Sequence, residues 1–256
     1  MGSSRRLRPS RRSLHAEIAT FTGRPVPKKF VKLPAAVFLL FPALALTLAT
    51  LRTVEKSALS AFWASPEGLW LLAGSAAGTV WFFAFPPLRV LYVMGHELTH
   101  ALWVWLHRGR VLDFESGWSG GKIETDRTNT AIVLAPYFFP IFTSLWIVSY
   151  GVARLIPGVP ANASLLLAGI GFTWALHLAF TIWMILRGQP DLEYGGHFFS
   201  LVVIYIGNLA FIASLLVLTS PGVTWRGFAS DFLAACIGIS SLLRDAVESL
   251  LHWTVT

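Results

Sequence analysis

The chain contains few charged residues and a single cysteine. Charged residues make up 13% of its 256 positions, well below the roughly 25% that is typical of a soluble globular domain. Cys236 is the only cysteine, which excludes a disulfide within the chain. No internal repeat of fixed period is visible in the sequence. The shortage of charge therefore argues against an ordinary soluble protein.

Apolar residues make up 55% of the chain and occur in long blocks. Each block is close to the ~20 residues that a helix needs to cross a bilayer. We therefore predict an all-α polytopic membrane protein with about six transmembrane helices, surrounded by the lipid bilayer. The fourth block contains Pro136 and Pro140, which predict a break or kink. The expected spans are residues 33–51, 68–85, 88–106, 131–152, 163–186 and 197–218.

Much of the positive charge precedes the first apolar block. A basic segment beside a span is typical of a cytoplasmic end and can contact anionic lipid headgroups. No nucleic-acid recognition module accompanies it, so we expect no nucleic-acid partner. We predict that residues 1–30 form a basic disordered tail and that the N-terminus is cytoplasmic. The basic residues of this region are Arg5, Arg6, Arg8, Arg11, Arg12, Arg24, Lys28, Lys29 and Lys32.

Residues 109–130 lack helical periodicity. Polar and apolar residues alternate on both sides of Gly117-Trp118-Ser119-Gly120-Gly121. Alternation around a glycine-containing turn is typical of a β-hairpin. A polar hairpin between two spans needs water or protein around it, because lipid cannot satisfy its backbone groups. We therefore predict a short β-hairpin after the third span.

The last segment differs from the expected spans in its charge. Residues 228–253 mix leucines with Arg244, Asp245 and Glu248 at helical spacing. This amphipathic pattern is typical of a helix that lies in the membrane interface. We therefore predict that residues 221–256 form an interfacial amphipathic helix.

The third expected span contains the strongest functional signal, Gly95-His96-Glu97-Leu98-Thr99-His100-Ala101. The pattern H-E-x-x-H places His96 and His100 on one helix face, close enough to bind one tetrahedral Zn²⁺. In this pattern Glu97 acts on the metal-bound water as a general base rather than on the metal. The sequence therefore predicts a zinc-dependent metalloendopeptidase with His96 and His100 as ligands and Glu97 as the catalytic base.

Chance, or a histidine pair tied into hydrogen bonds between helices, would explain the same pattern. An ionisable side chain within a span costs roughly 2.5 to 3.5 kcal/mol and usually marks function. Structural zinc binding contributes about 10 to 16 kcal/mol in small peptides, which offsets that cost. We therefore favour a zinc site.

A catalytic zinc needs a third protein ligand and an open position for water. Asp191 is our first candidate, because a carboxylate at a helix entrance can reach a neighbouring helix and the following glycines allow close packing. Glu193, His177 and His197 are the alternatives that the sequence leaves open. A histidine such as His177 within a span is as readily explained by a hydrogen bond in the core.

These features resemble the site-2 protease family of intramembrane zinc metallopeptidases, especially its short bacterial members, over residues 88–200. The sequence 96–100 resembles the motif helix of the family. Gly109-Arg110-Val111 and Gly120-Gly121-Lys122 resemble the hairpin that follows that helix, and Ala135-Pro136-Tyr137 opens the next span at a similar distance. Residues 31–220 would then form the transmembrane zinc metallopeptidase domain.

The third ligand in this family is an Asp in a Pro-containing L-D-G element. Here the corresponding stretch is Pro190-Asp191-Leu192-Glu193-Tyr194-Gly195-Gly196, in which neither acid is followed directly by glycine. The resemblance implies cleavage of a membrane protein or peptide substrate in or near a transmembrane segment, with the substrate added as a strand beside the hairpin. It also implies location in the bacterial inner membrane.

Two other functions fit the same residues. The site could hold a metal without proteolysis, for structure or for another hydrolysis, or the chain could be a helical scaffold subunit of a membrane complex without any metal. A closed site with four ligands would favour the first alternative, and the metal content of the purified protein separates the metal-binding hypotheses from the scaffold. No feature of the sequence assigns an oligomeric state.

Overall fold

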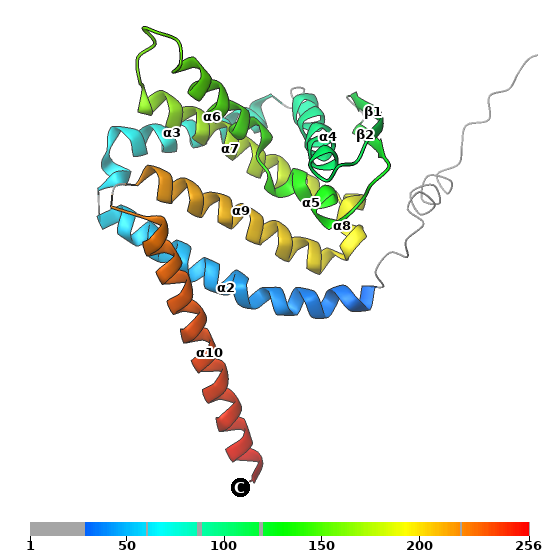
Figure 1. Cartoon of the computed structure of the whole chain (residues 1–256), viewed down its shortest axis with the longest axis vertical. Helices are drawn as coiled ribbons and strands as arrows, with labels where there is room; N and C mark the ends of the chain where they lie inside the picture. The colour runs from blue at the N-terminus through cyan, green and yellow to red at the C-terminus, as the bar shows by residue number, and fades with distance from the viewer. Residues whose placement is uncertain (1–28, 60, 86–88, 118–119, 221, 256) are drawn as a thin grey trace, which may run out of the picture.

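The computed structural model describes residues 29–59, 61–85, 89–117, 120–220 and 222–255 (Figure 1). Within these residues the chain is almost entirely helical, with one small antiparallel sheet. The all-α architecture with a hairpin after the motif helix is therefore confirmed. The expected tail falls mostly outside the described residues, because residues 1–28 are not among them, and the first described helix already begins at Lys29.

The elements follow one another with short connections. In chain order they are α2 (Lys29–Leu59), η1 (Phe62–Ala64), α3 (Pro66–Ala84), α4 (Arg89–Leu106), β1 (Val111–Gly117), β2 (Gly120–Thr125), α5 (Thr130–Phe138), α6 (Ile141–Ala153), α7 (Ala163–Leu186), α8 (Pro190–Gly195), α9 (His197–Thr219) and α10 (Trp225–Val255).

The long helices α2, α9, α7 and α3 run side by side, and α10 crosses their direction (Figure 1). Helix α3 packs on α7, α2 packs on α9, and α10 packs on α2. At one end of this bundle α4 contacts α5 and both strands, while the short helix α8 contacts α5 and α9. Elements from distant parts of the sequence therefore meet around α4, α5 and α8.

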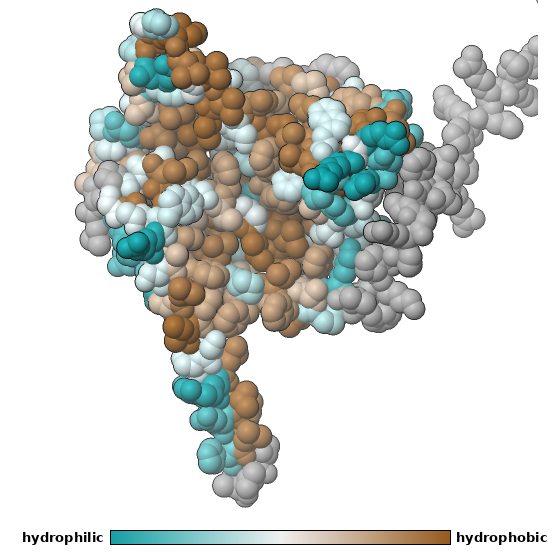
Figure 2. Space-filling model, viewed as in Figure 1, coloured by the Kyte–Doolittle hydropathy of each residue, from teal (hydrophilic) through white to brown (hydrophobic). Residues whose placement is uncertain are grey.

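The outer surface of the bundle is apolar. Figure 2 shows apolar residues across much of the visible face, and exposed side chains such as Phe38 of α2 and Leu218 of α9 contribute to the apolar surface. A soluble protein does not leave apolar helices of this length exposed to water. The chain is therefore a membrane protein.

The number of spans differs from the expected six. Among the described residues, four helices are long and apolar enough to cross a membrane, namely α2, α7, α9 and α10, or five when α5 and α6 count as one broken span. Helices α3 and α4 occupy two of the expected spans, with 19 and 18 residues, but they are not among these helices.

Helix α10 is long and apolar enough to cross a membrane, yet every side chain from Leu242 to Trp253 is exposed. Figure 2 shows hydrophilic residues along one side of its far half and apolar residues along the other. Its interfacial placement stays a prediction.

The fourth expected span is broken, as its prolines predict. Helices α5 and α6 meet at an angle of 70°, and Phe139 and Pro140 separate them. Pro140 lacks the backbone N–H that would continue the helix. The chain therefore changes direction immediately after α5, the helix that contacts α4.

The hairpin lies within the expected residues. Strands β1 and β2 pair antiparallel, with Glu115 opposite Lys122. At its base, the carboxylate of Asp126 accepts hydrogen bonds from the Arg110 backbone N–H at 2.6 Å and from Arg110 Nε at 3.1 Å. These bonds hold the pKa of Asp126 below its usual value. The hairpin is therefore closed by its own residues and packs on α4.

Glycines allow α3 and α7 to pack backbone to backbone. A Cβ atom at Gly74 would lie 2.0 Å from the carbonyl oxygen of Ala168, and one at Gly78 would lie 2.3 Å from that of Phe172. Small residues four apart are a common device for close helix packing in membranes. This contact holds α3 close against α7.

We predict that Gly74→Ala destabilises the protein by about 1 to 3 kcal/mol, because the new methyl group would overlap the α7 backbone. The matched control is Gly151→Ala in α6, where an added Cβ meets open space. That change should be neutral or stabilise the helix by up to about 1 kcal/mol. Thermal unfolding in detergent, followed by circular dichroism, measures both. Equal melting temperatures for the two variants would contradict the close contact.

Candidate metal centre

Helix α4 presents His96 and His100 on its buried face. The two imidazole rings lie one helical turn apart, with their centroids separated by 4.8 Å and their planes nearly perpendicular. Both side chains are buried, because this face of α4 packs against α5. The helical spacing predicted from the sequence therefore holds in the structure.

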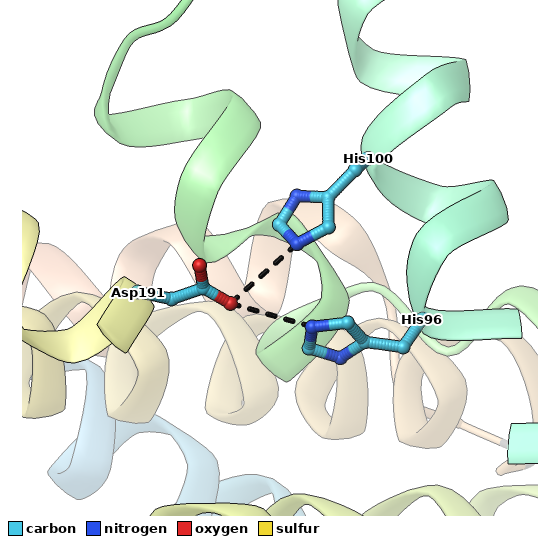
Figure 3. A group of neighbouring side chains, drawn as sticks. All are labelled: His96, His100 and Asp191. Atoms are coloured by element: carbon cyan, nitrogen blue, oxygen red, sulfur yellow. Dashed lines mark hydrogen bonds and ion pairs between the residues drawn. The ribbon is translucent and has the colours of Figure 1, made fainter. Parts of the chain in front are cut away.

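Asp191 of α8 reaches this histidine pair. Its Oδ2 atom lies 3.3 Å from His96 Nε2 and 3.5 Å from His100 Nε2. Figure 3 shows one carboxylate oxygen facing both rings from the opposite side of the site. The three donor atoms all lie within 4.8 Å of one another. The structure thus brings together residues that are 95 positions apart in the chain.

The spacing of these donors fits a tetrahedral ion. Ligand atoms about 2.0 to 2.1 Å from a tetrahedral zinc lie roughly 3.3 Å from each other, which is close to both nitrogen–oxygen distances given above. Two imidazoles and one carboxylate also match the donor set of catalytic zinc sites, which keep a fourth position for water. The residues present therefore fit zinc, and their role as its ligands stays a prediction.

The backbone of α5 orients His100. The Nδ1 atom of His100 lies 2.8 Å from the carbonyl oxygen of Ile132. Because a carbonyl oxygen only accepts, Nδ1 carries the proton and Nε2 presents its lone pair toward Asp191. Histidine ligands of metals are commonly fixed by such a hydrogen bond. His100 is therefore held in the tautomer that a metal requires.

Tyr137 of α5 holds the carboxylate. Its hydroxyl group donates a hydrogen bond of 3.0 Å to Asp191 Oδ2, and its ring lies edge-on to His96 at 5.2 Å. Only 1% of Tyr137 is exposed. The backbone carbonyl of the same residue accepts a hydrogen bond of 2.8 Å from Asn208 of α9. Tyr137 therefore connects the site to the core of the bundle.

The side chain of Glu97 lies between the backbone of its own helix, α4, and the hairpin. It is buried, and a Cβ atom at Gly121 of β2 would lie only 2.3 Å from its Cγ and 2.6 Å from its Oε1. Glu97 does not join the group of three donors. A side chain at position 121 would displace the carboxylate, so this glycine allows the hairpin to cover it.

The other candidates from the sequence lie outside the group. Glu193 of α8 and His197 at the start of α9 are exposed. His177 is buried in α7, but it contributes no donor to the three that converge. Among the described residues, Asp191 is therefore the acid that the fold brings to the histidine pair.

Sequence reasoning missed the contacts of Ile132 and Tyr137 with the candidate ligands. Tyr137 entered only through the family resemblance, and Ile132 did not enter at all. A tyrosine within an apolar helix needs a hydrogen-bond partner for its hydroxyl group, which is a usable signal. No such signal exists for Ile132, because its contribution comes from its backbone carbonyl.

Comparisons of the chain with models of protein families, with curated proteins and with solved structures give no match. The resemblance to site-2 proteases therefore depends on the residues and geometry of this chain alone.

We predict that Asp191→Asn lowers zinc affinity by at least about 100-fold, beyond the range seen for residues that only support a ligand. The matched change Glu193→Gln, two residues away in the same short helix, should leave affinity unchanged. Competition with a chromophoric chelator measures both constants. The reverse ranking of the two variants would show that Glu193 is the ligand.

Tyr137→Phe should lower zinc affinity by about 10-fold without removing a ligand, because it deletes only the hydroxyl group that holds Asp191. Tyr205→Phe is the control, since it deletes a hydrogen bond of 2.7 Å to Thr47 that involves no site residue. The same chelator titration applies. If both variants bind zinc like the wild type, Tyr137 does not position the carboxylate.

Proposed function

We propose that this chain is an intramembrane zinc metalloprotease that hydrolyses peptide bonds in or near transmembrane segments of membrane protein substrates. One observation carries the proposal. His96, His100 and Asp191 present converging donor atoms inside an apolar helical protein, with Glu97 on the same turn of α4. Ionisable residues are costly inside a membrane protein and usually mark function.

The donor set supports a catalytic site rather than a closed structural one. Structural zinc sites use four protein ligands, most often with cysteine, whereas catalytic sites use three and leave one position open. Among the described residues, the group has three members and no cysteine. When bound, zinc would supply a water of lowered pKa and would polarise the substrate carbonyl.

The protein residues then have distinct tasks. Glu97 accepts a proton from the attacking water at its carboxylate and passes it to the nitrogen of the leaving amine as the peptide bond breaks. Tyr137 and the Ile132 carbonyl hold Asp191 and His100 in place. The burial of His96, Glu97 and His100 lowers the local dielectric constant, which strengthens charge interactions in the site.

The hairpin is the proposed docking element for the substrate. A sheet of two strands leaves the outer edge of each strand without a partner in the described chain, and an extended peptide can add to such an edge. Helical segments must unwind before their peptide bonds can be attacked. Backbone hydrogen bonds to the hairpin would offset part of that cost.

The proposed setting is the bacterial inner membrane. The basic residues before α2 favour a cytoplasmic N-terminus, and the proposed substrates are membrane proteins or peptides in the same bilayer. The protein crosses this membrane several times, as its long apolar helices require.

We predict that Glu97→Gln retains about one zinc per chain but lowers cleavage by 100-fold or more, about the contribution of a general base. The amide keeps the shape of the side chain but cannot accept the proton. Zinc is measured by elemental analysis of the purified protein. Cleavage is measured by proteomic comparison of membrane fragments released in cells that carry the wild type or the variant.

Glu193→Gln is the control, because it removes an exposed acid near the site without touching the proposed base. If the wild type binds zinc but cells with wild type and with Glu97→Gln release the same membrane fragments, the chain is a metal-binding protein without proteolysis. Wild type without zinc would favour a helical scaffold.

A further inference from the structure

Lys32 is a buried lysine at the start of α2. Only 7% of the residue is exposed. Its Nζ atom donates a hydrogen bond of 3.0 Å to the backbone carbonyl of Tyr194, 162 positions away in the chain. The ammonium group also lies 4.4 Å from the centre of the Tyr194 ring and 5.5 Å from that of Phe199. Lys32 therefore joins α2 to the end of α8.

The surroundings of this charge are unusual for a simple anchor. Among the described residues, no carboxylate forms an ion pair with Lys32. A lysine at the end of a membrane helix normally extends its ammonium group into the interface. This ammonium group instead interacts with one carbonyl oxygen and two aromatic rings, and cation–π contacts are stronger where water is excluded. The contacts of Lys32 thus concentrate on the segment around α8.

Helix α8 depends on such contacts for its position. It has only six residues, and a helix of this length is not stable alone. The Leu192 carbonyl accepts a hydrogen bond of 3.0 Å from Ser200, and the Leu192 side chain is buried in the core. The hydrogen bond from Ser200 comes from α9, which directly follows α8 in the chain, and Tyr137 of α5 donates to Asp191 itself. Lys32 adds a contact that ties α8 to α2.

We propose that Lys32 is a positioning residue for the metal centre. By holding the Tyr194 carbonyl against α2, it fixes the rotation of α8 and keeps the Asp191 carboxylate within reach of His96 and His100. This inference rests on the proposed metal site, but it does not depend on what reaction that site performs. It makes α2 part of the metal centre, although α2 contributes no ligand.

The test compares purified full-length wild type, Lys32→Met and Lys32→Arg. Methionine keeps the length of the side chain without its charge, whereas arginine can donate to the carbonyl and stack on the rings. Lys56→Met is the control, because it removes another α2 lysine whose partner is Asp231 of α10. Three properties are measured: the zinc dissociation constant, hydrogen exchange of residues 189–196 and thermal unfolding of the zinc-free protein.

We expect Lys32→Met to weaken zinc binding by about 10-fold and to speed hydrogen exchange in residues 189–196. Lys32→Arg should stay close to the wild type in zinc affinity and in exchange rate, and Lys56→Met should change neither property. A role in overall stability alone would lower the melting temperature of the zinc-free protein and leave the zinc constant of the folded protein unchanged. That result overturns the proposal.

If Lys32→Met does not fold, Tyr194→Leu decides the question, because it removes one ring contact and keeps the carbonyl. It should weaken zinc binding about threefold, and an unchanged constant overturns the proposal. Wild type that binds no zinc overturns the metal site and this inference together. If the wild type binds zinc but cleaves nothing, and Lys32→Met binds zinc more weakly, the result overturns only the proteolytic function. It supports the positioning role of Lys32.

Discussion

The convergence of Asp191 on two imidazoles is the interaction on which the site depends. In an apolar bundle each of these side chains would be costly alone, because neither lipid nor apolar core can satisfy it. Their mutual contacts at 3.3 and 3.5 Å reduce that cost when a proton or a metal ion lies between the imidazole nitrogens and the carboxylate oxygen. The hydrogen bonds from Tyr137 and to Ile132 give Asp191 and His100 one further partner each. A buried polar group is less costly when it has such partners.

The packing around the site explains how such distant residues stay in register. Helix α5 lies between α4 and α8 and contacts both, and Tyr137 and Ile132 act from this helix on the two sides of the group. The 70° break before α6 ends α5 after nine residues, so that it supplies these two groups without continuing through the bundle. The proline that prevents a straight fourth span thus shapes the surroundings of the candidate metal centre.

Local patterns in the sequence predict the parts of this structure that depend on neighbouring residues. The expected span 163–186 coincides with α7, the hairpin lies within residues 109–130, and H-E-x-x-H places both histidines on one face. The choice between Asp191 and Glu193 is different. Two residues along a helix point about 200° apart, so only the rotation of α8 decides which acid faces α4. That rotation follows from the burial of Leu192 and from contacts with α5, α9 and α2, which no local pattern contains. The link 189–196 also carries no helical periodicity long enough to predict α8.

The contact between Glu97 and Gly121 places the proposed general base against the hairpin that is proposed to bind the substrate. Because position 121 has no side chain, the hairpin backbone approaches the carboxylate directly. A peptide added to an edge of this two-stranded sheet would be only one or two strand spacings of about 4.8 Å from β2. Its backbone would then lie close to the proposed base. The same glycine that buries Glu97 therefore sets the distance between the docking element and the general base, and a larger residue there would disturb both together.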